Sequence, residues 1–365
     1  MLKNYILRTC VVLILLLFSC QEDDSYVPLE DDDPILESPV NFDINLVPYP
    51  TLSEYNFYDG TMSDLNPVYG VLPYDLISPL FSDYAKKKRF IWMPDDVSAS
   101  YVSDYSSLDF PTGTVLIKNF YYNNVQPNNQ KKIIETRLMI KKSEEWTFAN
   151  YRWNEEQTEA TFTTDEHELG LEWNENGETK NVIYRIPPFT ECFSCHNKYD
   201  VPLPIGPKPQ NLNRTLTYAE GSKNQLSKWV EMGYLNPNFP SNIDTTIGWD
   251  DESKSLESRA RAYLDINCAH CHSEQSYCEY APVRFEYEKT TEPINLGVCV
   301  NGNFIFDNSI TKIIAPSNHE RSIIYNRLNT TVGSIRMPLL GRTLIHEEGV
   351  QLIENWINSL DYICD

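Results

Sequence analysis

The sequence predicts an α+β protein, in which an N-terminal β-rich domain (an antiparallel sandwich or meander) is followed by a C-terminal α-helical domain. Apolar residues alternate with polar ones in the first half of the chain. In the last third they recur at helical spacing. A connector with crowded prolines and glycines, "VPLPIGPKPQNLNR", lies between the two parts. These three observations predict two regions with different secondary structure.

The first twenty residues resemble a bacterial lipoprotein signal peptide. Lys3 and Arg8 precede an apolar run at 11–18, which is too short to span a bilayer comfortably and ends in Ser19-Cys20. An uncleaved membrane anchor is the alternative. The small residue before the cysteine favours cleavage and lipidation of Cys20. We therefore expect an outer membrane lipoprotein of the bacterial cell envelope, attached to the membrane through the lipid on Cys20.

The segment after Cys20 has the composition of a disordered acidic tether. Residues 21–39 carry eight carboxylates and few groups that could pack. The start, "CQEDD", resembles a surface-export signal of outer-membrane lipoproteins, which would expose the protein on the cell surface; a plain solvated linker is the alternative. The chain has a formal net charge of −22, and this excludes nucleic acid as a partner because phosphate binding needs a basic surface.

The first half of the chain has the pattern of short antiparallel strands. Turn-forming clusters such as "VQPNNQ" and "NENGET" separate segments rich in β-branched and aromatic residues. A carbohydrate site could use some of these aromatic residues, but a strand-rich core accounts for most of them. The expected strands lie at 113–122, 132–142, 146–153, 159–164 and 181–186.

The last third contains two segments with the period of a helix, at 255–267 and 347–360. Glu347 and Glu348 begin the second segment, where the helix dipole favours negative charge. These helices should bracket a small domain. The expected segments are a signal peptide (1–19), an acidic tether (20–44), a β-rich domain (45–190), a first motif with its connector (191–253) and a helical domain (254–365).

Two C-x-x-C-H motifs are the most specific chemical signal in the chain. In c-type haem proteins, each cysteine of such a motif forms a thioether to the porphyrin, and the adjacent histidine becomes the proximal iron ligand. The spacing lets one short turn reach one macrocycle with all three groups. The motifs are "ECFSCHNK", with Cys192, Cys195 and His196, and "NCAHCHSE", with Cys268, Cys271 and His272.

Two other chemistries use C-x-x-C pairs. Four thiolates can form a tetrahedral zinc site, and a single pair can act as a redox dithiol. Neither requires a histidine directly after both pairs. An exported chain also passes through the oxidising compartment in which bacteria attach haem. We therefore expect two covalently bound haem c groups per chain, with His196 and His272 as ligands of the two irons.

The distal ligand of the second iron is expected to be Met337, in "IRMPLLGR", because a thioether opposite histidine is a common pair in c-type haem proteins. Core packing is the alternative use of this methionine. The first iron has no evident distal ligand in the sequence. Cys278 and Cys299 flank a loop after the second motif, and we expect a disulfide between them rather than two buried thiols.

Several blocks of the chain resemble one family, the dihaem c-type cytochromes of exported bacterial proteins, which is poorly characterised. The resemblance covers residues 65–360. It implies that both motifs carry haem and that the C-terminal region is a cytochrome c domain, but it supplies no substrate. The blocks are "YDLISPLFSDYAKKKRFIWMP", "FPTGTVLIKNFYY", "ETRLMIKK", "YRWNEEQTEA", "PIGPKPQNLNR", "SRARAYLDINCAHCH" and "RMPLLGRTLIHEEGVQLIENWI".

The expected function is single-electron transfer between two haems and redox partner proteins at the cell envelope. The haem supplies the redox chemistry, and the protein sets its potential, exposure and orientation. The first alternative is an enzyme, a dihaem peroxidase or oxidase with an open position at the first iron. The second is a surface binding module whose β-rich domain recognises a glycan or a protein and whose haem is accessory.

Overall fold

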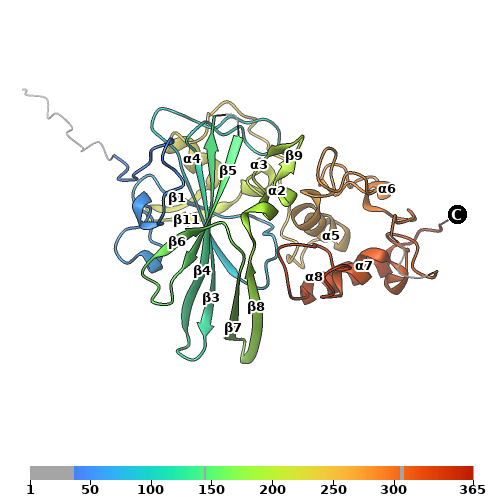
Figure 1. Ribbon diagram of the computed structural model, residues 1–365. Coiled ribbons are helices and arrows are strands. Elements are labelled where there is room, and N and C mark those ends of the chain that lie inside the picture. The colour runs from blue at the N-terminus through green and yellow to red at the C-terminus, as the bar shows by residue number, and fades with distance from the viewer. Residues whose placement is uncertain (1–36, 144, 305–307, 365) are drawn as a thin grey trace, which may run out of the picture. The chain divides into compact units, whose positions relative to one another are not determined.

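An antiparallel sheet of eight strands dominates the computed structural model, which describes residues 37–143, 145–304 and 308–364 (Figure 1). Strands β1 to β6 lie side by side in sequence order, and β7 pairs with both β3 and β8. The eight strands are β1 (Leu72–Tyr74), β2 (Lys86–Trp92), β3 (Val115–Val125), β4 (Gln130–Lys142), β5 (Glu145–Trp153), β6 (Ala160–Thr163), β7 (His167–Glu175) and β8 (Glu178–Ile186).

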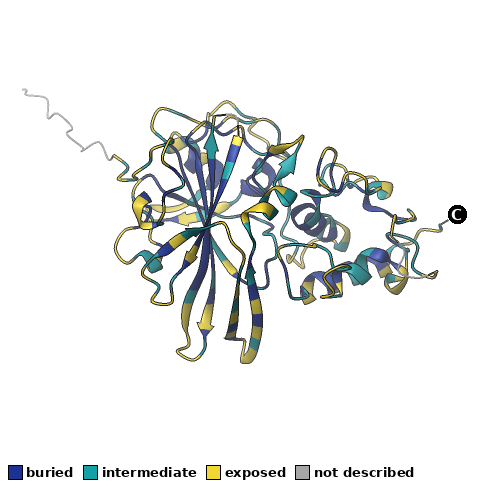
Figure 2. Ribbon diagram, viewed as in Figure 1, coloured by how far each residue is buried: buried dark blue, intermediate teal, exposed yellow. Residues whose placement is uncertain are grey.

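The two faces of the sheet are covered by different cores. Side chains alternate between the faces along each strand, so Phe90 packs in one core and its neighbour Ile91 in the other. The face of Ile91 is covered by residues that follow the first motif, including Leu212 and Trp229. Figure 2 shows that the buried residues concentrate in the centre of the sheet, whereas β7 and β8 alternate between buried and exposed positions.

The helices in the described part of the chain are few and short. The two longest of these are α5 (Leu256–Leu264) and α8 (Glu347–Ser359), which pack on each other in a third core. The others are α2 (Cys192–Cys195), α3 (Pro209–Leu212), α4 (Gln225–Glu231), α6 (Pro293–Leu296) and α7 (Ile323–Leu328). Single turns are η1 (Ser53–Tyr55), η2 (Met62–Asp64), η3 (Phe189–Glu191), η4 (Asp265–Ala269) and η5 (His319–Arg321). Two small hairpins pair β9 (Asn197–Lys198) with β10 (Val201–Pro202) and β11 (Thr215–Tyr218) with β12 (Gly221–Asn224).

The predicted α+β class with a C-terminal α-helical cytochrome c domain is wrong. The fold is mainly β, with only about 20% helix, and its C-terminal region is not a cytochrome c helical domain. The segments with helical period do form α5 and α8. Residues 270–304 and 308–346 between them form turns, isolated bridges and the short helical segments α6, η5 and α7 instead, because glycine, proline, asparagine and serine interrupt the apolar runs there.

Candidate metal and haem site

The first motif forms one helical turn directly after the sheet. Strand β8 leads through η3 into α2, and the His196 amide donates to the Cys192 carbonyl at 3.0 Å. This turn presents both thiols and the imidazole within four residues of each other, as attachment to a single macrocycle requires. Cys192, Cys195 and His196 are half-buried and line a cavity.

The imidazole of His196 is held in one tautomer. Its Nδ1 lies 2.8 Å from the Leu203 carbonyl oxygen, and because a carbonyl can only accept, Nδ1 carries the proton. Nε2 is then left with its lone pair and can bind a metal. Burial also lowers the pKa of His196 to about 4, which keeps the ring neutral. This is the arrangement that a histidine ligand of iron or zinc needs.

The second motif begins where α5 ends in the π-helical turn η4, which contains Cys268. Such turns are rare and often lie at functional sites. The amides of Cys271 and His272 both donate to the Cys268 carbonyl, at 3.1 and 2.9 Å, and this closes a turn like that of the first motif. Buried Asp265 fixes the start of this turn through an ion pair with Lys208 at 3.1 Å.

His272 is packed against the Phe285 ring, with the ring centroids 5.6 Å apart and the planes almost perpendicular. Among the described residues its buried Nδ1 has no hydrogen-bond partner. Burial lowers its pKa to about 4. A neutral, partly enclosed imidazole with an unused nitrogen fits the predicted role as a metal ligand.

The fold brings the two motifs into contact. Ligand atoms of Cys195, His270 and Cys271 all lie within 4.8 Å of one another. The Cys271 thiol also lies 3.7 Å from the Ser194 carbonyl oxygen. The contact is supported nearby, where the Tyr199 amide donates to the Gln275 carbonyl at 2.9 Å and Lys198 pairs with Glu286 at 2.8 Å. The sequence predicted two motifs but not their proximity.

The thiols at this contact are coupled. Hydrogen bonds from the Cys271 thiol and from His270 lower the pKa of Cys195 well below its usual range. Hydrogen bonding with Cys195 and with Cys278 raises the pKa of Cys271. Burial raises the pKa of Cys268 to about 12. Cys195 is thus the thiol closest to the thiolate form, which is the form that binds metals.

His270 is the functional candidate that sequence reasoning missed. It lies inside the second motif, in "CAHCH", where the usual pattern assigns no role to the residue before the second cysteine. Its buried Nδ1 has no hydrogen-bond partner in the described part of the chain. In the sequence, the signal of this residue is that the second motif has a histidine between its two cysteines, in addition to the histidine that follows them.

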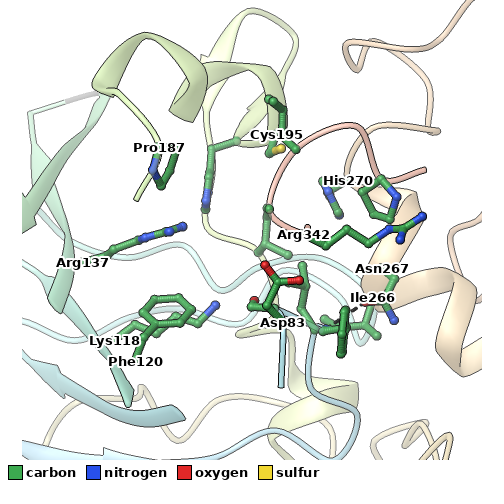
Figure 3. A pocket seen from close by; sticks show the side chains of 18 of the residues that line it. Asp83, Lys118, Phe120, Arg137, Pro187, Cys195, Ile266, Asn267, His270 and Arg342 are labelled. Carbon is green, nitrogen blue, oxygen red and sulfur yellow. Dashed lines mark hydrogen bonds between the residues drawn. The ribbon is translucent and has the colours of Figure 1, made fainter. Parts of the chain in front are cut away.

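The cavity beside the first motif has a volume of about 180 Å³. Its walls come from the sheet, from the first motif and from residues 336–343, and His270 also lines it. Figure 3 shows Lys118 and Arg137 extending into this space from the sheet, with Cys195 and His270 on another side. Groups that are distant in sequence therefore share one enclosed space.

The segment around Met337 is held by a buried arginine. Arg342 donates to the carbonyls of Met337 at 2.9 and 3.0 Å and of Leu344 at 2.8 Å. Met337 itself is half-buried, and its neighbours Arg336 and Pro338 line the cavity of the first motif. Within the described residues no contact between Met337 and His272 is recorded. Ligation of an iron by Met337 stays a prediction.

The predicted disulfide between Cys278 and Cys299 is wrong. Cys299 is bonded to Cys364, with their Cα atoms 5.3 Å apart, and Cys278 is a buried free thiol. The Cys278 amide donates to the Cys271 carbonyl at 2.9 Å, and this holds Cys278 at the second motif. The chain after α8 returns to Cys299, a long-range approach that spacing in the sequence does not reveal.

Three predictions concern residues at the N-terminus: the signal peptide at 1–19, lipidation of Cys20 and most of the tether at 20–44. Residues 1–36, which include Cys20, lie outside the described part of the chain. Within the described part, no helix combines the length and the apolar character needed to cross a bilayer. Comparisons of the chain with protein-family models, curated proteins and solved structures found no match.

Proposed function

We propose that this chain is a dihaem c-type protein that transfers single electrons, with one haem attached to Cys192 and Cys195 and the other to Cys268 and Cys271. The observation that carries this proposal is the contact between the two motifs. Cys195 and Cys271 are attachment sulfurs in different motifs, and they lie within 4.8 Å of each other. Two redox groups attached at adjacent sulfurs are placed for exchange of electrons with each other.

The donor set supports haem at both motifs. His196 presents Nε2 for an iron, since Nδ1 is used by Leu203, and His272 is neutral and has an unused nitrogen. The haem supplies the one-electron chemistry when it is bound. The residues of this chain hold the group by two thioethers, supply an imidazole to the iron and exclude water with a partly apolar cavity.

The volume of the cavity sets a condition on this proposal. About 180 Å³ is less than the roughly 300–1,000 Å³ of sites that enclose a drug-sized ligand, so one wall has to move outward when a haem is attached. Several of residues 336–343 line the cavity from a segment outside the regular strands, and this wall can move once the hydrogen bonds of Arg342 and Asp83 that hold it are broken. The sheet wall is fixed by the hydrogen bonds of β2 to β4.

The electron carrier is favoured over the dihaem peroxidase or oxidase, and over a surface binding module with accessory haem. A carrier keeps six ligands on both irons, so that peroxide and oxygen find no free position. Met139 lines the same cavity as His196 and is a candidate for the sixth ligand there. The reduced protein should bind less than one carbon monoxide per two haems; stoichiometric binding together with fast peroxide turnover would favour the enzyme.

A zinc protein is the second candidate, and one observation favours it. Cys195, His270 and Cys271 are grouped as metal ligands are, and the lowered pKa of Cys195 favours its thiolate. The two candidates use different histidines. Haem attachment requires His196 and His272 but not His270, whereas the zinc cluster requires His270.

Metal analysis of the protein, expressed with a haem-maturation system, separates the two candidates. Two haems per chain by pyridine haemochrome assay, retained on denaturation, support the proposal, and Cys192→Ala with Cys195→Ala should leave one. His270→Ala is the matched control, because it should keep both haems. One bound zinc, no haem, and loss of the zinc in His270→Ala would establish the second candidate instead.

The location of the protein is part of the same proposal. A lipid on Cys20 would hold it at the outer membrane, where redox partner proteins of the envelope can reach it. Cys20→Ala should release the protein from membranes. Protection of the wild-type protein from protease added to intact cells would place it on the inner side of the outer membrane and show that the acidic segment is only a linker.

A further inference from the structure

A row of three cations crosses the sheet beside the first motif. Arg89 on β2 is directly opposite Lys118 on β3, and Lys118 is directly opposite Arg137 on β4. All three side chains line the cavity that also contains Cys192, Cys195 and His196. Like charges directly opposite each other destabilise an antiparallel sheet. Three in succession, in a chain of net charge −22, therefore need an explanation.

The carboxylates of the protein neutralise this row only in part: in the described residues they pair with the two arginines, and no salt bridge to Lys118 is present. Arg137 donates two hydrogen bonds to the carboxylate of buried Glu135, at 2.6 and 2.9 Å. Arg89 donates one Nη to Asp75 at 2.6 Å, while its other Nη is buried and has no partner in the described residues, although Arg89 is only 5% exposed. For Lys118 the contact recorded within that part of the chain is the ring of Phe120, 4.9 Å from Nζ.

The other carboxylates that line the cavity are used elsewhere. Asp83 accepts the amides of Thr343 and Leu344, each at 2.8 Å. Glu191 pairs with Arg185 at 2.7 Å. Burial and the neighbouring Arg89 also lower the pKa of Lys118 well below its usual range, so the row holds less charge than its three side chains can carry. A bound anion would restore the charge on Lys118.

We propose that Arg89, Lys118 and Arg137 form an anion site for carboxylates and that its occupant is the propionate edge of the haem attached to the first motif. This inference rests on the proposed function. The haem is the favoured source of the carboxylates because its attachment cysteines and its histidine line the same cavity as the row. Arginine and lysine at neighbouring positions suit two carboxylates on one edge of a ligand.

Charge removal in the row tests the proposal. Lys118→Gln and Arg89→Gln should each leave two haems per chain and lower the reduction potential of one haem, because loss of a nearby cation favours the oxidised iron. The affected haem should be the one that is lost in Cys192→Ala with Cys195→Ala. Lys131→Gln is the matched control: Lys131 lies on β4 and is exposed, with Nζ donating to the Ser63 carbonyl at 2.6 Å, and neither potential should change.

The outcomes separate this inference from the proposed function. A wild-type protein without haem refutes the proposed function. Two haems with unchanged potentials in both Lys118→Gln and Arg89→Gln refute the anion site. If Lys118→Gln does not fold, Lys118→Met keeps a long side chain without charge and gives the same comparison. Inorganic phosphate that raises the melting temperature of the holoprotein, but not of Lys118→Gln, would assign the row to a small free anion and overturn the propionate assignment.

Discussion

The Cys299–Cys364 disulfide should contribute strongly to the stability of the fold. It closes a loop with a sequence separation of 65 residues. A loop of this length loses chain entropy in the unfolded state that corresponds to about 4 kcal/mol at 25 °C. Replacement of both cysteines by alanine should therefore lower the free energy of unfolding by about that amount, measured by urea denaturation under oxidising conditions.

The same experiment carries its own control. Wild-type protein treated with a thiol reductant should unfold at the urea concentration of the double variant, because both have lost the same cross-link. Peptide mapping of the oxidised protein should recover Cys299 linked to Cys364. A loss of stability below about 1 kcal/mol, or a peptide that links Cys278 to Cys299, would refute the reasoning.

Three further perturbations test the interior of the protein. Glu135→Leu should cost about 3 kcal/mol by urea denaturation, because it leaves half-buried Arg137 and the buried Tyr184 hydroxyl without their acceptor. Glu135→Gln should lose less, and a cost of Glu135→Leu below about 1 kcal/mol would contradict this. Burial lowers the pKa of His346 to about 4 from a usual value of 6.5. Between these two pH values the unfolded chain binds a proton on this residue that the folded protein does not bind, so the free energy of unfolding should fall as the pH drops from about 6.5 towards 4. His346→Asn, which keeps an acceptor for Tyr263, should make this fall shallower by about 1.4 kcal/mol per pH unit, and an unchanged slope would argue against a neutral His346. Met337→Ala should lower the potential of one haem in a redox titration; two unchanged potentials would make Met337 a packing residue.

Local patterns in the sequence predicted local structure. The expected strands form β3, β4, β5, β6 and β8, because period-two alternation is set by the two faces of each strand. Strand β2 was not predicted, since "KKKRFIW" starts with a run of cations and does not alternate. The helical segments formed α5 and α8, but the inference from them to a helical domain was wrong because the residues between them do not continue the pattern.

The residues of each motif were predicted from the sequence, but the contact between the two motifs was not. The spacing of each motif identified its cysteines and histidine, because the chemistry of attachment fixes that spacing. The contact of Cys195 with Cys271 depends on how the end of β8 packs near the end of α5, and single-sequence periodicity contains no information on that packing. The row of Arg89, Lys118 and Arg137 likewise depends on strand register. The partner of Cys299 depends on the return of the C-terminus.

The order in which the cavity walls are synthesised bears on how a cofactor could be attached. The sheet and first-motif walls are complete once the chain is available to Leu203, whereas Tyr263, His270, His346 and several of residues 336–343, which also line the cavity, are synthesised later. Under the proposed function, a haem delivered early to Cys192 and Cys195 would meet an open half-site, and one delivered late would meet a closed one. Attachment at the first motif and folding of the C-terminal segment would then compete in time, and a delay in haem supply would leave folded chains without their cofactor.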